Sequence, residues 1–354
     1  MPGRFRRAVL TAVMVAMLAV TAGAPVSAGA VKLQISVGIG AFCVSGSGVP
    51  RAVHVVSLRT PDDELRSRFR REAGRQGRWL GCFNSVHGTP IFINAGDVIK
   101  VRVEGQKRRF TVPDIRPRTD RVGDVIRGRG PVGASIQVSV DRPGFTTDDP
   151  GVRRDVRVNG RGRWRLDLSD QYDIRGADGI SVALADDGLH VSSNSFAPHI
   201  QLDAGGNVLS GAIDPGRTVS FRLVGGDGAT RATASASEFF SGTYRVSLQD
   251  ERGNAVYPRA GDRIESDIAG DGDLAIPDSF LRADASEDRI KARCMPHSEF
   301  ELFTAGDDFR FFEGRTGDDG TLRRSADLGV GDFVELTCRY ESGDQLRLVT
   351  DAGR

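Results

Sequence analysis

The sequence has few cysteines, few aromatic residues and no excess of either charge. Its 354 residues include four Cys, two Trp and 7% aromatic residues in all, and 48 Lys and Arg stand against 47 Asp and Glu. Arg4, Arg6 and Arg7 lie in a segment that we expect to be removed; without them the balance is (48 − 3) − 47 = −2. A nucleic-acid-binding protein needs a basic footprint, so we expect no nucleic-acid partner. The 39% apolar content excludes a disordered chain.

Long apolar runs are also absent, except near the N-terminus. The three arginines precede an apolar run over residues 8–22, and a stretch rich in small residues follows at 23–30. This order is typical of a secretory signal peptide, which we place at residues 1–30 with cleavage after Val26-Ser27-Ala28 or Ala28-Gly29-Ala30. The alternative is a membrane anchor, but the run of 22 − 8 + 1 = 15 residues is shorter than the roughly 20 apolar residues that a bilayer requires. We therefore expect a secreted, extracellular or cell-surface-associated protein with no transmembrane segment after cleavage.

Motifs that carry chemistry are missing as well. The five histidines have no H-x-x-x-H or H-E-x-x-H spacing, and there is no Gly-x-Ser-x-Gly sequence. His54 falls in an alternating pattern and is predicted to be partly buried, whereas His199 and His297 flank prolines and are predicted to be exposed loop residues. The sequence therefore predicts no catalytic residues and no enzyme.

The chain does contain internal repeats, which are visible as landmarks that recur in the same order. The first is a strand that ends in a small residue, namely Gly46, Gly128, Gly211 and Ala292, at spacings of 128 − 46 = 82, 211 − 128 = 83 and 292 − 211 = 81. A Gly-x-aromatic turn follows at Trp79, Trp164 and Tyr244, with Leu322 in the weaker fourth copy. A Gly-Asp pair comes next, at Gly96-Asp97, Gly261-Asp262 and Gly331-Asp332, and as Gly176-Ala177-Asp178 in the second copy. These landmarks define repeats at 31–115, 116–200, 201–280 and 281–354.

Within each repeat, apolar and polar residues alternate with the period of a β-strand, as at Ile136, Val138 and Val140. About seven strands are predicted per repeat, and those of the second lie near 115–119, 124–129, 135–140, 153–158, 164–168, 179–184 and 189–196. Short strands divided by Gly, Pro and Asp are typical of a β-sandwich. The one helical candidate is 61–72, where acids precede arginines as a helix dipole favours; the alternative there is a solvated loop. Prolines near the ends of the first three repeats predict stiff joints and a semi-rigid rod.

The four cysteines of an exported protein predict two disulfides. Cys43 and Cys82 both lie in the first repeat, and Cys294 and Cys338 both lie in the fourth. Any other pairing would cross two whole repeats, so we predict Cys43–Cys82 and Cys294–Cys338. A zinc site is the competing interpretation, but there is no Cys-x-x-Cys and no paired His.

One acidic cluster is a candidate metal site. Asp267, Asp271, Asp273 and Asp278 surround two glycines near the end of the third repeat. Several carboxylates on a glycine-rich segment can bind Ca²⁺, although the spacing is not that of an EF-hand. Asp-Gly is also the commonest tight-turn pair, and we favour a plain turn here. We therefore predict no cofactor, with Ca²⁺ as the alternative.

With these landmarks in view, the chain resembles the tandem bacterial Ig-like repeats of secreted and surface proteins over about residues 31–351. The resemblance implies an all-β fold: a tandem array of four Ig-like β-sandwich domains after the signal peptide. It also implies a non-enzymatic interaction or structural protein, adhesin- or spacer-like, whose partner is an unknown extracellular protein or polysaccharide. The alternative is a carbohydrate- or calcium-binding module. Sugar binding needs exposed rings, and we expect Trp79, Trp164 and Tyr244 in the core, which leaves the pairs Phe239-Phe240 and Phe311-Phe312.

Overall fold

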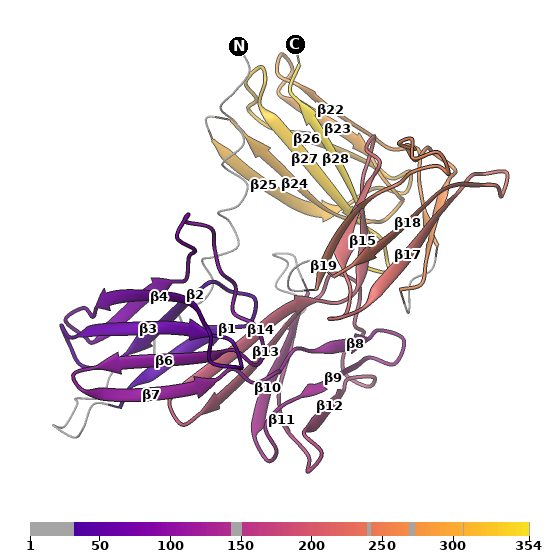
Figure 1. Ribbon diagram of the computed structural model, residues 1–354. Helices are drawn as coiled ribbons and strands as arrows, with labels where there is room; N and C mark the ends of the chain where they lie inside the picture. The colour runs from indigo at the N-terminus through magenta and orange to yellow at the C-terminus, as the bar shows by residue number, and fades with distance from the viewer. Residues whose placement is uncertain (1–31, 143–150, 239–241, 269–272, 307, 354) are drawn as a thin grey trace. The chain divides into compact units, whose positions relative to one another are not determined.

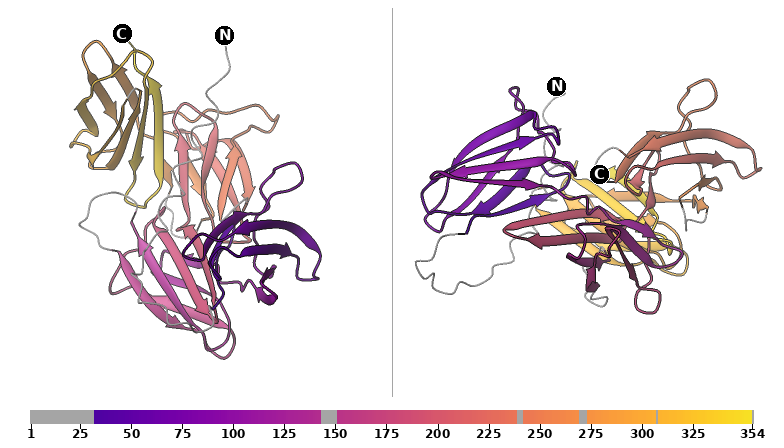
Figure 2. Two further views of the ribbon diagram at one scale, coloured as in Figure 1. Left: turned by 90° about the vertical axis from the view of Figure 1, so that its left-hand side faces the viewer. Right: turned by 60° about the horizontal axis from the view of Figure 1, so that its bottom comes forward.

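The computed structural model describes residues 32–142, 151–238, 242–268, 273–306 and 308–353. Within these ranges the regular structure consists of β-strands, with no α-helix (Figures 1 and 2). The all-β prediction is therefore confirmed. The predicted signal peptide lies outside the described residues, as do Phe239, Phe240 and Asp271.

The 28 strands of the described residues fall into four sets of seven along the chain. Set 1 consists of β1 (Gln34–Gly38), β2 (Cys43–Ser47), β3 (Val53–Arg59), β4 (Leu65–Glu72), β5 (Arg78–Cys82), β6 (Val98–Val103) and β7 (Gln106–Thr111). Set 2 consists of β8 (Arg118–Asp120), β9 (Val125–Arg129), β10 (Ser135–Asp141), β11 (Val152–Arg157), β12 (Arg163–Asp167), β13 (Gly179–Asp186) and β14 (Leu189–Phe196). Each of the seven strands predicted for the second repeat overlaps one of these.

Sets 3 and 4 also contain seven strands each. Set 3 consists of β15 (His199–Asp203), β16 (Val208–Ala212), β17 (Thr218–Val224), β18 (Thr230–Ser237), β19 (Thr243–Ser247), β20 (Arg263–Ser266) and β21 (Leu274–Ala275). Set 4 consists of β22 (Phe280–Asp284), β23 (Arg289–Arg293), β24 (Glu299–Ala305), β25 (Phe309–Arg315), β26 (Thr321–Ser325), β27 (Phe333–Arg339) and β28 (Gln345–Asp351). The limits drawn from the sequence at 200/201 and 280/281 fall inside β15 and β22.

Every set pairs its strands in the same way. The first, second and fifth strands form a three-stranded row, and the other four form a second row. The three-stranded row of set 1 continues into the four-stranded row of set 2, because β1 pairs in parallel with β14. In the same way β15 pairs in parallel with β28. Each pair of sets therefore shares one seven-stranded sheet (Figure 1).

The hydrophobic core is divided between these two pairs of sets. Alternate partners across each shared joint are buried residues, such as Ile35 beside Leu189 and Leu202 beside Leu346. Both three-stranded and four-stranded rows therefore turn their apolar side chains to the same face of the shared sheet, where the smaller sheets cover it. One cluster of buried residues spans 33–197 and a second spans 200–352. The result is two sandwich-like units, each made from two sets.

Two of the sequence landmarks are directly opposite each other in the structure. The small residue one position before the end of the second strand of each set is the cross-strand partner of the residue after Gly-x. The pairs are Gly46 with Trp79, Gly128 with Trp164, Gly211 with Tyr244 and Ala292 with Leu322. A Cβ on Gly128 would lie 2.5 Å from Cζ2 of Trp164. The wide ring therefore requires glycine, and the fourth set replaces both members with Ala and Leu.

The Gly-Asp landmark is a turn that precedes the sixth strand of each set. In the first copy Gly96 has φ of 89°, and Oδ2 of the buried Asp97 accepts the amide of Asn94 at 2.8 Å. The second copy has the same bonds at Asp178, but Ala177 occupies the glycine position with φ of 63°. Because only glycine adopts this conformation without strain, Ala177 explains why the motif looked stretched in the sequence.

The helix or loop expected at 61–72 is wrong, because residues 65–72 form β4, which pairs with β3. Arg66, Arg68 and Arg70 occupy alternate positions on its outer side. On the other side Ser67 is buried and Phe69 packs between Trp79 and Phe83. Arg66 forms an ion pair with Asp97, 31 residues away. The arginine thus pairs with an acid on a distant segment. The local order of acids before arginines, which a helix dipole favours, therefore did not indicate a helix here.

The disulfides join Cys43 to Cys82 and Cys294 to Cys338, the two pairs that the repeats select. The first links directly opposed residues of the neighbouring strands β2 and β5. The second links the end of β23 to β27, and so connects the two sheets of set 4. The bonds therefore occupy different places in sets 1 and 4.

Candidate functional site

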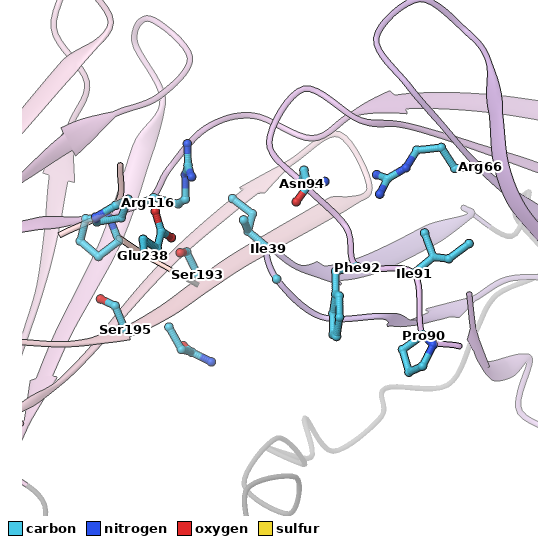
Figure 3. Close-up of a pocket in the computed structure, with 14 residues that line it drawn as sticks. Ile39, Arg66, Pro90, Ile91, Phe92, Asn94, Arg116, Ser193, Ser195 and Glu238 are labelled. Atoms are coloured by element: carbon cyan, nitrogen blue, oxygen red, sulfur yellow. The ribbon is translucent and has the colours of Figure 1, made fainter. Parts of the chain in front are cut away.

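A hollow of about 410 Å³ opens beside sets 1, 2 and 3. Figure 3 shows Arg116 and Glu238 at one side of it and Arg66 at the other. These charged groups already have partners. Arg66 pairs with Asp97, Arg116 donates to Asp114 at 2.9 Å, and Glu238 accepts the amide of Gly216 at 2.6 Å. The hollow therefore offers satisfied polar groups and a few apolar side chains.

Catalytic groups are not assembled in this hollow. Ser193 and Ser195 line it, but no histidine is among the described residues that line it. In the part of the chain that the structure describes, no three His, Cys, Asp or Glu side chains are grouped so as to hold a metal ion.

The histidines have structural surroundings. His54 is fully buried, stacks on Trp79 with ring centroids 5.3 Å apart, and has a lowered pKa because burial disfavours its charged form. His297 is exposed, as predicted. The prediction for His199 is wrong: it begins β15, is buried, and its pKa is lowered to about 4 by burial. Its Nδ1 lies 3.0 Å from the carbonyl oxygen of Ala197.

The described members of the acidic cluster have separate partners. Asp267 accepts the amide of Ser220 at 2.9 Å, Asp273 pairs with Arg263 at 3.1 Å, and Asp278 pairs with Arg293 at 3.4 Å. Asp271 lies outside the described residues. The structure therefore does not bring the three described carboxylates together.

The aromatic side chains divide as the sequence predicts. Trp79, Trp164 and Tyr244 are at most 4% exposed. On the solvent side of set 4, Phe311 lies opposite Phe303, which stacks with Phe309 at 5.9 Å. Phe309 is 77% exposed. Set 4 thus presents a small apolar surface that the pair Phe311-Phe312 only partly indicated.

The least expected surface is a row of cations on the outer face of set 2. Arg118, Arg127 and Arg165 lie on three neighbouring strands, and the register places Arg127 directly beside each of the other two. Arg129 and Arg163 form another opposed pair on the same face. All five side chains are exposed. Like charges in opposed positions destabilise a sheet by roughly 0.2–1 kcal/mol per pair.

Set 4 has the same row at the equivalent positions. Arg282 lies opposite Lys291, which lies opposite Arg323. In set 1 the equivalent positions hold three uncharged residues, Ser36, Ser45 and Leu80. In set 3 they hold Gln201, Ser210 and a single cation, Arg245. The cationic rows therefore occur in the second member of each pair of sets and are absent from the first.

The row of set 2 borders a hollow of about 750 Å³ lined by seven arginines and a single carboxylate, Asp114. Burial acts to raise the pKa of Asp114, but the hydrogen bond and charge of Arg116 outweigh it and lower the pKa. Arg165 pairs with Asp167 at 2.8 Å, whereas neither Arg118 nor Arg127 forms an ion pair among the described residues. The hollow therefore has a strong excess of positive charge.

Sequence reasoning missed these rows because it considered only the net charge of the chain. Arg127 is 127 − 118 = 9 residues from Arg118 and 165 − 127 = 38 residues from Arg165, and the three lie side by side only through strand register. The available signal was a comparison of the repeats at one position: Ser45, Arg127, Ser210 and Lys291 each precede a landmark residue. No helix among the described residues has the length and apolar character needed to cross a membrane.

No protein-family model matches the chain, and no curated protein matches it. Among solved structures it is similar to a tetra-tandem repeat from the extending region of a large adhesion protein, with 12% identity, a TM-score of 0.19, and coverage of 90% of this chain and 98% of that one. It is also similar to the BSP domain of a biofilm-associated protein, with 10% identity, a TM-score of 0.19, and coverage of 88% and 92%. A third is E. coli alpha-2-macroglobulin, with 12% identity, a TM-score of 0.17, and coverage of 91% and 28%. Likenesses this weak establish no common role.

Proposed function

We propose that this protein is a non-enzymatic secreted or cell-surface interaction protein, adhesin- or spacer-like, built from four Ig-like repeats after a signal peptide. The observation that carries the proposal is the parallel pairing of β1 with β14 and of β15 with β28. Backbone hydrogen bonds across these joints resist separation of neighbouring repeats better than a flexible linker does. The two disulfides support an oxidising compartment outside the cytoplasm.

The first test is surface labelling of intact cells that express the full chain. We expect a membrane-impermeant amine or carboxyl label to reach the protein on cells or in the medium. Labelling only after the cells are broken would contradict the proposal.

The spacer-like role has a mechanical test. When the full chain is stretched by its ends under reducing conditions, two large unfolding events are expected, because each shared sheet joins two sets. Four equal events of about half that length would show that the repeats act independently and would remove the support that the joints provide.

A second candidate function, carbohydrate binding, is favoured by the exposed rings of Phe309 and Phe311. Such rings can stack on the faces of sugars. Substitution of both by Ala should then abolish retention on a neutral polysaccharide such as cellulose or dextran, and no initial retention would exclude these two probes.

A further inference from the structure

We propose that the cationic rows of sets 2 and 4 bind a linear polysaccharide that carries carboxylates. This inference rests on the proposed function, because it names the partner of an extracellular interaction protein. It does not depend on the aromatic surface of set 4.

The first argument is that the rows are costly unless they have a partner. Arg127 lies between Arg118 and Arg165, so cations face one another across three strands. The exposed Asp167 pairs with Arg165 at 2.8 Å and offsets part of this repulsion, but it does not neutralise the opposed Arg118 and Arg127. Three arginines are not needed there for folding, since set 3 builds the same strands with Gln201, Ser210 and Arg245. The arrangement recurs at Arg282, Lys291 and Arg323 of set 4, which makes an accidental cluster a poor explanation.

The second argument concerns the chemistry of the ligand. A guanidinium group binds a carboxylate through two parallel hydrogen bonds. Adjacent strands lie about 4.8 Å apart, which is close to the length of one sugar unit in an extended chain. A polymer with one carboxylate on each sugar can therefore place successive charges on successive strands of the row.

The third argument separates a polysaccharide from a nucleic acid. Proteins that bind single strands combine basic residues with exposed rings on which bases stack. In the face of set 2, the ring of Trp164 points into the core and is 3% exposed. In set 4, Phe280 is half-buried, and the guanidinium groups of Arg282 and Arg293 lie over its ring at 5.6 and 5.9 Å. Beside the two rows, the described residues thus provide charge without a freely exposed ring.

The test uses the full chain and polygalacturonate, with neutral dextran as the uncharged polymer. Arg118→Gln with Arg127→Ser converts the row of set 2 into that of set 3, and Arg282→Gln with Lys291→Ser does the same in set 4. The matched control is Arg245→Gln, which removes a lone exposed cation at the position equivalent to Arg165. Affinity is measured by titration calorimetry at low and at physiological salt.

We expect the native chain to bind polygalacturonate but not dextran, and to bind more weakly as salt rises, because exposed charges are screened within about 8 Å at 0.15 M. The four substitutions together should weaken binding by roughly tenfold or more, since each row loses two charge-assisted contacts. The control should bind like the native chain. Unchanged far-UV circular dichroism in all variants excludes unfolding as the cause.

Several outcomes would overturn the inference. They are no binding to polygalacturonate, equal binding by the fourfold variant, tighter binding to single-stranded oligothymidylate, or binding to dextran sulfate alone. Surface labelling separates this inference from the proposed function. If the chain is found at the cell surface or in the medium but does not bind polygalacturonate, only the inference is contradicted. If the chain is confined to the cell interior, the proposed function is contradicted whatever the chain binds in solution.

Discussion

The contact between Gly128 and Trp164 makes a quantitative prediction about packing. In Gly128→Ala the new Cβ would lie 2.5 Å from Cζ2 and 2.6 Å from Cε2 of the indole ring. The ring cannot move away freely, because it is buried and its Nε1 donates to the carbonyl of Arg129 at 2.8 Å. Overpacking of this kind costs about 2 kcal/mol. Gly128 does not have a positive φ, so backbone strain adds nothing.

A substitution of Trp164 tests whether the clash with its ring causes the loss of stability in Gly128→Ala. Trp164→Leu alone should cost about 3 kcal/mol, because it leaves a cavity. Together the two changes reproduce Ala292 and Leu322 of set 4, and the added methyl group fills part of that cavity. We therefore expect the double variant to lose about 3 rather than 5 kcal/mol, a coupling of about 2 kcal/mol.

Urea denaturation followed by tryptophan fluorescence measures these values. The chain has two tryptophans, Trp79 and Trp164, and both belong to the core of the first sandwich-like unit. Trp79 therefore still reports when Trp164 is replaced. Gly160→Ala is the control: no atom lies within 4 Å of the added Cβ, and a change below about 0.5 kcal/mol is expected. A neutral Gly128→Ala, or strictly additive effects in the double variant, would refute the packing argument.

Three further predictions concern His199, one disulfide and the acidic cluster. Because burial lowers the pKa of His199 from 6.5 to about 4, the unfolded chain binds its proton first, and stability should fall by roughly 1 kcal/mol between pH 7.5 and 5.5. Melts should show a steeper slope for the native chain than for His199→Gln, in which the buried His54 still contributes; equal slopes would contradict the prediction. Replacing Cys294 and Cys338 by Ala opens a 44-residue loop and should destabilise the second unit by about 4 kcal/mol, as seen by circular dichroism, without moving the tryptophan transition of the first. Millimolar Ca²⁺ should not raise the melting temperature relative to EDTA, whereas a filled site would add about 2.7 kcal/mol at a hundred times Kd; a rise abolished by Asp267→Asn would show that the turn binds the ion.

The sequence predicts the local elements well and the long-range ones poorly. The strands of set 2 and the burial of Trp79, Trp164 and Tyr244 follow from short patterns, because alternation and turn residues act over a few positions. β4 was missed because it has only two inward positions, Ser67 and Phe69, among many charges.

The remaining errors have the same physical origin. His199 is buried among groups from distant segments: the adjoining Ile200 amide donates to Asp344, 144 residues away. The parallel joints also escaped notice, since the first strand, with Gly38 at its end, has the composition of an ordinary edge strand. The cationic rows depend on register across three strands, which net charge does not reveal.

The joint between β1 and β14 determines when the first sandwich-like unit can finish folding. Ser36 and His190, which meet across it, are 154 residues apart. At a synthesis rate of roughly 5–20 residues per second, β1 waits about 8–30 s for its partner. During that time one backbone edge of β1 is unpaired and can pair with another chain. The Cys43–Cys82 bond holds β2 to β5 but leaves this edge open, so the newly made N-terminal half should need a chaperone until residue 192 has emerged.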